Sequence, residues 1–225
     1  LEGLPQSSHP GDDQLMVRSV ADPLEPLNRL TFTVNELAFH VAVNPASKGY
    51  NRVVPGPIRR GIRNFRDNLF FPLRFVSSLL QGKLSEAGTE TKRFLINSTL
   101  GIGGLGNPAA NKYDLQPANE DLGQAFGSWG WNSQMYLFLP IIGPSSERDA
   151  LGEAGRVFLD PASLVPVGKT GLTFNKFAFE AKALEQLLAT YYDPYEIARL
   201  LYTVNRDIAV RDAEPNSAQE DTGQT

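Results

Sequence analysis

Apolar residues repeat at helical spacing along most of this chain, and that repeat constrains its fold more than any other feature. Leu27, Leu30, Val34 and Leu37 recur every three or four residues, which places them on one face of a helix over residues 26–42. Similar patterns predict helices over residues 57–68, 73–80, 86–100, 147–159, 170–191 and 194–210. We therefore expect a mainly α fold with short connections.

Proline, glycine and capping residues predict where these helices begin and end. Pro45 should end the first helix, and Pro72 should separate the helices over residues 57–68 and 73–80. Ser85 is a candidate N-cap for the following helix. The run Gly101–Gly106 predicts a loop, and residues 107–135 read as further loop with one helix near residues 120–126. The apolar stretch Tyr136–Pro140 favours an extended segment or part of a hairpin.

The length of 225 residues suits one domain, which we place at residues 22–210. Residues 1–21 and 211–225 are polar and poorly patterned, so we expect a flexible N-terminal tail and a disordered acidic C-terminal tail. The chain begins at Leu1 without a methionine or a leader, and we expect a fragment whose natural start has been removed. No stretch approaches the roughly 18–20 apolar residues of a spanning helix.

The composition argues against most catalytic chemistry. The chain has no cysteine and only two histidines, His9 and His40, so thiolate, zinc and histidine-base sites are hard to build. Residues 101–106 fit G-x-G-x-x-G, but they leave a predicted helix and enter a loop, whereas a dinucleotide site needs a strand before and a helix after. P-loop and G-x-S-x-G motifs are absent from the sequence. A two-carboxylate glycosidase has no positive support.

One segment stands out by charge and aromatic content. Residues 52–74 hold six arginines and one acid, in a chain whose net charge is −4. Arginines beside phenylalanines suit a helix at a membrane interface, where guanidinium groups meet phosphate. The alternatives are a core-facing apolar stripe with solvated arginines, or a nucleic-acid surface, against which the acidic remainder of the chain argues.

The order of several motifs resembles the MlaA/VacJ lipoprotein family over about four-fifths of the chain. Asp22-Pro23-Leu24-Glu25 with Asn28-Arg29, Phe32 and Asn35 is similar to the family's opening signature. Further blocks follow in order: Asn64-Phe65, Asn68-Leu69 and Pro72; Leu79 to Gly82; Arg93 to Gly104; Asp121 to Gly130; Tyr136 to Pro140; Gly143 to Asp149; and Asp193-Pro194-Tyr195. The chain departs from the family pattern at Asn107, at Leu122 and over Ser133 to Met135.

The resemblance implies a ring-like arrangement of amphipathic helices, with a short hairpin and Gly-rich loops around a central channel. It implies an outer-membrane lipoprotein of a Gram-negative bacterium, embedded in the inner leaflet, whose lipid anchor is missing from this sequence. The implied function is not enzymatic. Phospholipids mislocalised to the outer leaflet would pass through an amphipathic channel to a soluble periplasmic lipid carrier, which maintains outer-membrane asymmetry. An outer-membrane trimeric porin is the further implied partner, with no cofactor, metal or nucleic acid.

The motif positions give candidate site residues. For the lipid passage they are Asn97, Ser98, Thr99, Gly101, Gly103, Gly104, Trp129, Gly130, Tyr136 and Leu137. For the membrane interface they are Phe65, Arg66, Phe70, Phe71, Arg74 and Phe75. The alternative function is a membrane-bound scaffold that organises porins without passing lipid. An enzyme acting on lipids ranks third.

Overall fold

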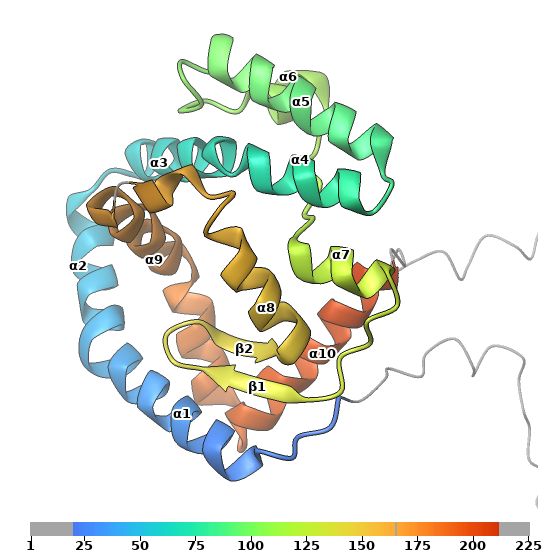
Figure 1. The fold of residues 1–225 in the computed structure, drawn as a ribbon. Helices are drawn as coiled ribbons and strands as arrows, with labels where there is room; N and C mark the ends of the chain where they lie inside the picture. Colours follow the sequence, from blue (N-terminus) through green and yellow to red (C-terminus); the bar gives the residue numbers. More distant parts are fainter. Residues whose placement is uncertain (1–19, 165, 212–225) are drawn as a thin grey trace, which may run out of the picture.

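The computed structural model describes residues 20–164 and 166–211, and most of them are helical, as the apolar periodicity predicts (Figure 1). The predicted tails, residues 1–21 and 211–225, lie outside the described residues except at their inner ends.

The first part of the chain forms a curved run of helices rather than separate rods. Helix α1 (Glu25–Ala38) passes through a π-helical turn, η2 (Phe39–Val43), directly into α2 (Asn44–Val53). The prediction that Pro45 ends the first helix is wrong. Pro45 lies in the first turn of α2, where a missing N–H is tolerated, and the wide π turn lets the helical path continue.

Helices α3 (Gly56–Leu69) and α4 (Phe71–Leu80) confirm the predicted break near Pro72, and α5 (Leu84–Thr99) follows. Ser85 does not cap α5, because the helix begins one residue earlier, with Lys83 in the cap position. The sequence analysis missed α6 (Pro108–Tyr113). Its signals are Pro108 in the first turn and the Asn107 side chain, which accepts a hydrogen bond from the Ala110 N–H.

The remaining elements follow the predicted order. Helix α7 (Leu122–Ser128) is capped by Asp121, and the strands β1 (Tyr136–Leu139) and β2 (Gly143–Ser146) form an antiparallel hairpin that pairs Tyr136 with Ser146. After them come α8 (Glu147–Arg156), the 3₁₀ turn η3 (Pro161–Leu164), α9 (Pro166–Thr190) and α10 (Pro194–Arg211). Helix α9 begins four residues before its predicted start at Thr170.

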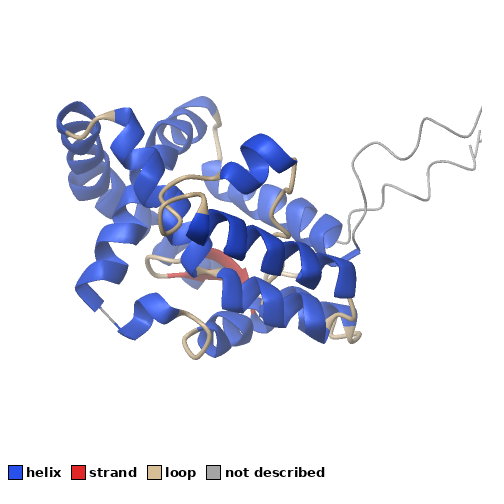
Figure 2. Ribbon diagram, turned by 90° about the horizontal axis from the view of Figure 1, so that it is seen from above, coloured by secondary structure: helices blue, strands red, loops and turns tan. Residues whose placement is uncertain are grey.

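The helices are arranged as a ring around the hairpin and α8. Figure 1 shows α1, α2, α3, α4, α7 and α10 following one another around the outside, with α5 and α6 as a further layer beyond α4. Figure 2, seen from above, shows the two strands surrounded by helices. The mainly helical, ring-like prediction is therefore confirmed.

A cluster of aromatic rings fixes the hairpin against α1 and α10. Phe32 of α1 makes edge-to-face contacts with Phe138 of β1 and Tyr195 of α10, with ring centroids 5.3 and 5.7 Å apart. Tyr136, also in the cluster, is fully buried. Such pairs stabilise by about 0.5–1.5 kcal/mol beyond the burial of their area.

Two asparagines of α1 make hydrogen bonds to backbone groups along the edge of β1 that does not pair with β2. The buried Asn28 side chain donates to the Tyr136 carbonyl (3.0 Å) and accepts from the Phe138 N–H (2.8 Å). Asn35 repeats this pattern two turns later, donating to the Leu139 carbonyl and accepting from the Ile141 N–H, both at 3.0 Å. Each side-chain amide thus takes the place of a peptide group in a neighbouring strand, and the hairpin is fixed to α1 along its length.

Candidate functional site

The main concave feature of the described residues is a cavity of about 990 Å³ between α1, η2, the hairpin and helices α7 to α10. Its volume lies at the upper end of the range for small-molecule sites. Apolar side chains form most of one side, from α1, η2, the hairpin turn and α9, and include Phe32, Phe39, Phe138, Ile141, Phe177, Leu184, Leu187 and Leu188. Leu201 of α10 adds a further apolar side chain.

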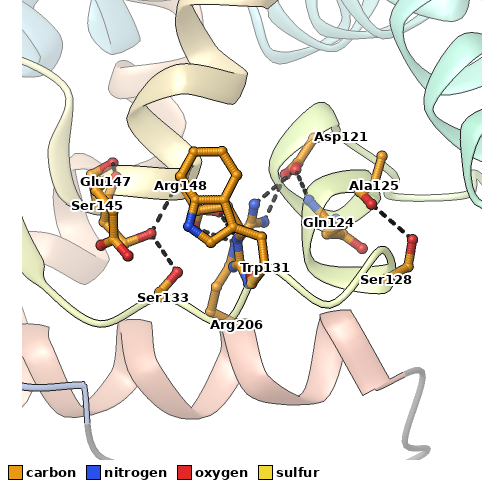
Figure 3. Close-up of polar contacts among 12 residues, drawn as sticks. Asp121, Gln124, Ala125, Ser128, Trp131, Ser133, Ser145, Glu147, Arg148 and Arg206 are labelled. Carbon is orange, nitrogen blue, oxygen red and sulfur yellow. Dashed lines mark hydrogen bonds and ion pairs between the residues drawn. The ribbon is translucent and has the colours of Figure 1, made fainter.

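The opposite wall, where α7, α8 and α10 meet, is polar. Arg206 of α10 donates through both terminal nitrogens to the two carboxylate oxygens of Asp121, each at 2.7 Å, and through Nε to Asp149 of α8 at 2.5 Å. The Tyr202 hydroxyl also donates to Asp149, at 2.5 Å. Figure 3 shows Arg206 between the helices, with its contact to Asp121 drawn. One guanidinium thus connects three helices at the cavity wall.

The electrostatics of this wall keep both carboxylates charged. Burial alone would raise the pKa of Asp121, but the hydrogen bonds and charge of Arg206 outweigh it and hold that pKa below its ordinary value. The pKa of Asp149 is lowered in the same way, against burial, by Arg206, Tyr202 and Arg148. Burial raises the pKa of the Tyr202 phenol, and the neighbouring Asp149 charge raises it further. The wall therefore stays ionised over the physiological range.

Two glycines let α7 and α8 approach closely beside this ion cluster. A Cβ atom on Gly152 would lie 2.6 Å from the Gly123 backbone nitrogen, and one on Gly123 would lie 2.4 Å from an Asp149 carboxylate oxygen. Both distances are too short for a real Cβ atom, so neither position has room for a side chain. Both glycines line the cavity.

None of the ten residues predicted for the lipid passage lines this cavity. Five of them belong instead to the junction between α5 and its neighbours. The Asn97 side chain accepts from the Ala109 N–H (3.0 Å), and Ser98 accepts from Asn68 (3.0 Å). Gly104 has φ +90° and packs against the Asn68 side chain, where a Cβ would lie 2.7 Å from Nδ2. The other two, Gly101 and Gly103, lie in the same turn.

The other five passage candidates have varied surroundings. Thr99, at the end of α5, donates to the Leu95 carbonyl. Trp129 is exposed and donates to the Leu80 carbonyl at 2.8 Å, and Gly130 follows it with φ +93°. Tyr136 is buried in the aromatic cluster, and Leu137 lies on the other face of β1. None of these five residues lines the cavity.

The residues predicted for the membrane interface lie on α3, on α4 and, for Phe70, at the junction between them, and most of them contact other parts of the chain. Phe70 is buried, with the guanidinium groups of Arg66 and Arg156 about 4.5 and 4.7 Å from its ring centroid. Arg74 donates to the buried Glu90 at 2.8 Å. Phe71 contacts both Phe75 and Phe94, with ring centroids 5.4 and 4.5 Å apart. Phe65 is 39% exposed and faces outward.

Sequence reasoning missed the residues that do line the cavity. The sequence marks Asp121 as an acid at a helix start and as part of a motif, marks Asp149 only as part of a motif, and gives no role to Arg206. A weak signal existed, because Tyr202 and Arg206 follow each other at helical spacing on α10 and would share one face. Their acidic partners lie 53 to 85 residues away, which no local pattern reveals.

The described residues hold neither a metal cluster nor a membrane-spanning helix. Within residues 20–164 and 166–211, no cluster of three or more His, Asp or Glu side chains could hold a metal ion. In the same part of the chain, no helix combines the length and apolar character that crossing a membrane requires.

Comparison with known protein families identifies the family of this chain. The sequence model of the MlaA lipoprotein family matches residues 20–209, nearly all of the described chain. The chain belongs to the MlaA lipoprotein family. The resemblance inferred from the motif order is thereby confirmed.

Relatives and a solved structure agree with the family assignment. The intermembrane phospholipid transport system lipoprotein MlaA of Haemophilus influenzae is 29% identical over 221 residues, covering 93% of this chain and 87% of its own. The protein of the same name from Escherichia coli is 29% identical over 204 residues, covering 86% and 80%. A structure solved in work on the structural basis for maintenance of bacterial outer membrane lipid asymmetry is 27% identical, with a TM-score of 0.73, and covers 84% of this chain and 99% of its own.

Proposed function

We propose that this MlaA family member transports phospholipids, removing those mislocalised to the outer leaflet and so maintaining outer-membrane lipid asymmetry. The observation that carries the proposal is the cavity of about 990 Å³, which has an apolar side on α1, η2 and α9 and a charged wall at α7, α8 and α10. A phospholipid needs both surfaces, because its acyl chains require apolar contact and its headgroup requires polar contact. The names of the two MlaA relatives support the same substrate class.

We further propose that the protein works as a lipoprotein of the Gram-negative outer membrane, in the inner leaflet, and that residues 22–210 form one domain with a tail at each end. A soluble periplasmic carrier would receive the lipid, and a trimeric porin would hold the protein in the membrane. The transport would need no chemical step by this chain. Phe65 and the exposed apolar residues of α1, which include Leu30 and Leu37, are the candidates for contact with lipid tails.

The test compares cells that lack the gene with cells in which the full-length protein is restored. We expect surface-exposed phospholipid to rise on deletion and to fall on restoration. Exposure that does not change on deletion would contradict the proposal. A scaffold that organises porins without passing lipid is not favoured, because it gives no role to the large amphipathic cavity. The scaffold alternative would regain support if variants that fill the cavity returned surface-exposed phospholipid in the deletion strain to its normal level.

A further inference from the structure

Acidic side chains outnumber basic ones in the lining of the cavity. Five carboxylates reach the lining, from Glu36, Asp121, Asp149, Glu153 and Glu180, against three cationic groups, from Lys176, Arg156 and Arg206. Each of these cations already contacts an acid. Arg206 lies between Asp121 and Asp149, Arg156 contacts Glu153 at 2.6 Å, and Lys176 lies 3.9 Å from Glu180. The lining therefore offers an anionic ligand no cation without a carboxylate beside it.

The excess negative charge is concentrated at Glu36 and Glu180. The polar wall is close to neutral, because Arg148 behind it contacts Asp149 at 2.9 Å in addition to Arg206. Among the described residues, Glu36 has an ion-pair contact only with the His40 ring, at 3.9 Å. Glu180 contacts the exposed Lys176, and the charge of Arg66 on α3 also acts on it from a greater distance. Their side chains are 33% and 55% exposed, so both carboxylates remain accessible.

The two glutamates lie close to one part of the cavity, around Phe39. Glu36 is one helical turn before Phe39 on the path from α1 into η2. Glu180 lines a smaller adjoining cavity of about 270 Å³ together with Phe39, from the side of α9. Because both carboxylates also line the main cavity, they approach the same space from two separate elements.

We infer that the cavity favours phospholipids whose headgroup ends in an ammonium, such as phosphatidylethanolamine, over those with a net negative headgroup, such as phosphatidylglycerol. This inference rests on the proposed function. An ammonium group gains from two accessible carboxylates, whereas a headgroup that ends in hydroxyls leaves its phosphate charge uncompensated and repelled by them. Glu36 and Glu180 are then the residues that determine headgroup preference.

The test measures which lipid the purified full chain retains. The protein is incubated with detergent micelles that hold equal amounts of phosphatidylethanolamine and phosphatidylglycerol and is then re-isolated, and bound lipid is identified by mass spectrometry. We expect phosphatidylethanolamine to be enriched roughly fivefold, the size of effect that one or two partly solvated charges give. The double variant Glu36→Gln/Glu180→Gln should move the ratio to near one, and Glu180→Lys should favour phosphatidylglycerol.

A matched control removes the same charge elsewhere. Asp114 and Asp207 lie outside the cavity lining, so Asp114→Asn/Asp207→Asn should keep the native ratio. A native chain that binds both lipids in the micelle ratio would overturn the inference and leave the proposed function standing. A native chain that retains no phospholipid would overturn both. A control pair that shifts the ratio as far as the glutamate pair would show that overall charge, and not the cavity, sets the preference.

Discussion

At the scale of single residues, polar side chains decide how the elements around the cavity are joined. Asn28 is 2% exposed and uses both ends of its amide, donating to Asp22 (2.7 Å) and to the Tyr136 carbonyl, and accepting from the Phe138 N–H. The sequence places Asn28 in a family motif but does not indicate its partners in β1, which lie more than a hundred residues away.

We expect Asn28→Ala to lower the free energy of unfolding by about 2–4 kcal/mol, because it leaves a buried N–H and a buried carbonyl of β1 without partners. Chemical denaturation of the purified chain measures this. Asn64→Ala is the control. Its side chain makes one exposed hydrogen bond, to the Leu105 carbonyl, so its cost should stay near 0.5–1 kcal/mol. Equal effects for the two variants would contradict the role given to Asn28.

The Arg206 cluster predicts a pH-dependent effect. The pKa values of Asp121 and Asp149 are lowered in the folded chain, so their contribution to stability is present above the ordinary carboxyl pKa near 4 and is lost as pH falls through the folded values. Arg206→Gln leaves two partly buried carboxylates without their main cation, which should cost about 3 kcal/mol at pH 7. The deficit should narrow as pH falls toward 3, because the carboxylates then become neutral.

Denaturation of the native chain and of Arg206→Gln at several pH values checks this prediction. A deficit that is constant from pH 7 to pH 3 would mean that Arg206 stabilises the fold by packing and not by its charge.

At the scale of elements, the sequence predicted most helices because each has an apolar stripe and recognisable ends. It failed where a local rule has two outcomes. A proline can end a helix or occupy its first turn. Pro45 lies in the first turn of α2, after a π turn that no sequence pattern indicates. Helix α6 has only six residues, too few to show a periodic stripe, and depends on its cap at Asn107. The predicted hairpin formed because its partner strand lies directly after its turn.

The crossing of α7 and α8 depends on Gly152, and we expect Gly152→Ala to destabilise the chain by about 1–3 kcal/mol. The added methyl group would meet the Gly123 backbone at 2.6 Å, and backbone cannot move aside as a side chain can. Gly88→Ala in α5 is the matched control. It has open space around its Cβ position, so it should stabilise by about 0.5–1 kcal/mol through helix propensity. Thermal unfolding of both variants checks the prediction, and it fails if both change stability in the same direction.

At the scale of the whole molecule, the family resemblance implies a central channel, but the residues that line the cavity could not be predicted from the sequence. Its lining comes from α1, η2, the hairpin and α7 to α10, and a residue that faces a cavity repeats at the same spacing as one that faces a packed core. Leu184 and Leu187 therefore read as ordinary core positions. Most of the motif residues that the sequence predicts for the lipid passage lie instead where α5 meets its neighbours or in the hairpin.

Filling the cavity should reduce lipid transport without unfolding the chain. Leu184 is 38% exposed and lines the cavity, so Leu184→Trp adds bulk to the open space and not to a packed core. We expect cells with this variant to accumulate surface phospholipid, in the direction of the deletion. Leu95→Trp, at a 56% exposed position on α5 outside the cavity lining, should leave transport unchanged. Normal lipid exposure with folded Leu184→Trp would argue against the cavity as the route.

The asparagines along β1 also affect how copies of this chain meet. A strand with an unpaired edge can add a strand from a second molecule, which is a common route to aggregation and domain swapping. Here one edge of β1 pairs with β2, and the other is covered by the side chains of Asn28 and Asn35 on α1 and, at Tyr136, by the Ala21 carbonyl. The two-stranded sheet therefore has no free edge on the β1 side. A chain that carries both Asn28→Ala and Asn35→Ala would leave the N–H groups of Phe138 and Ile141 without partners and should self-associate as its concentration rises, even where the remaining helices stay folded.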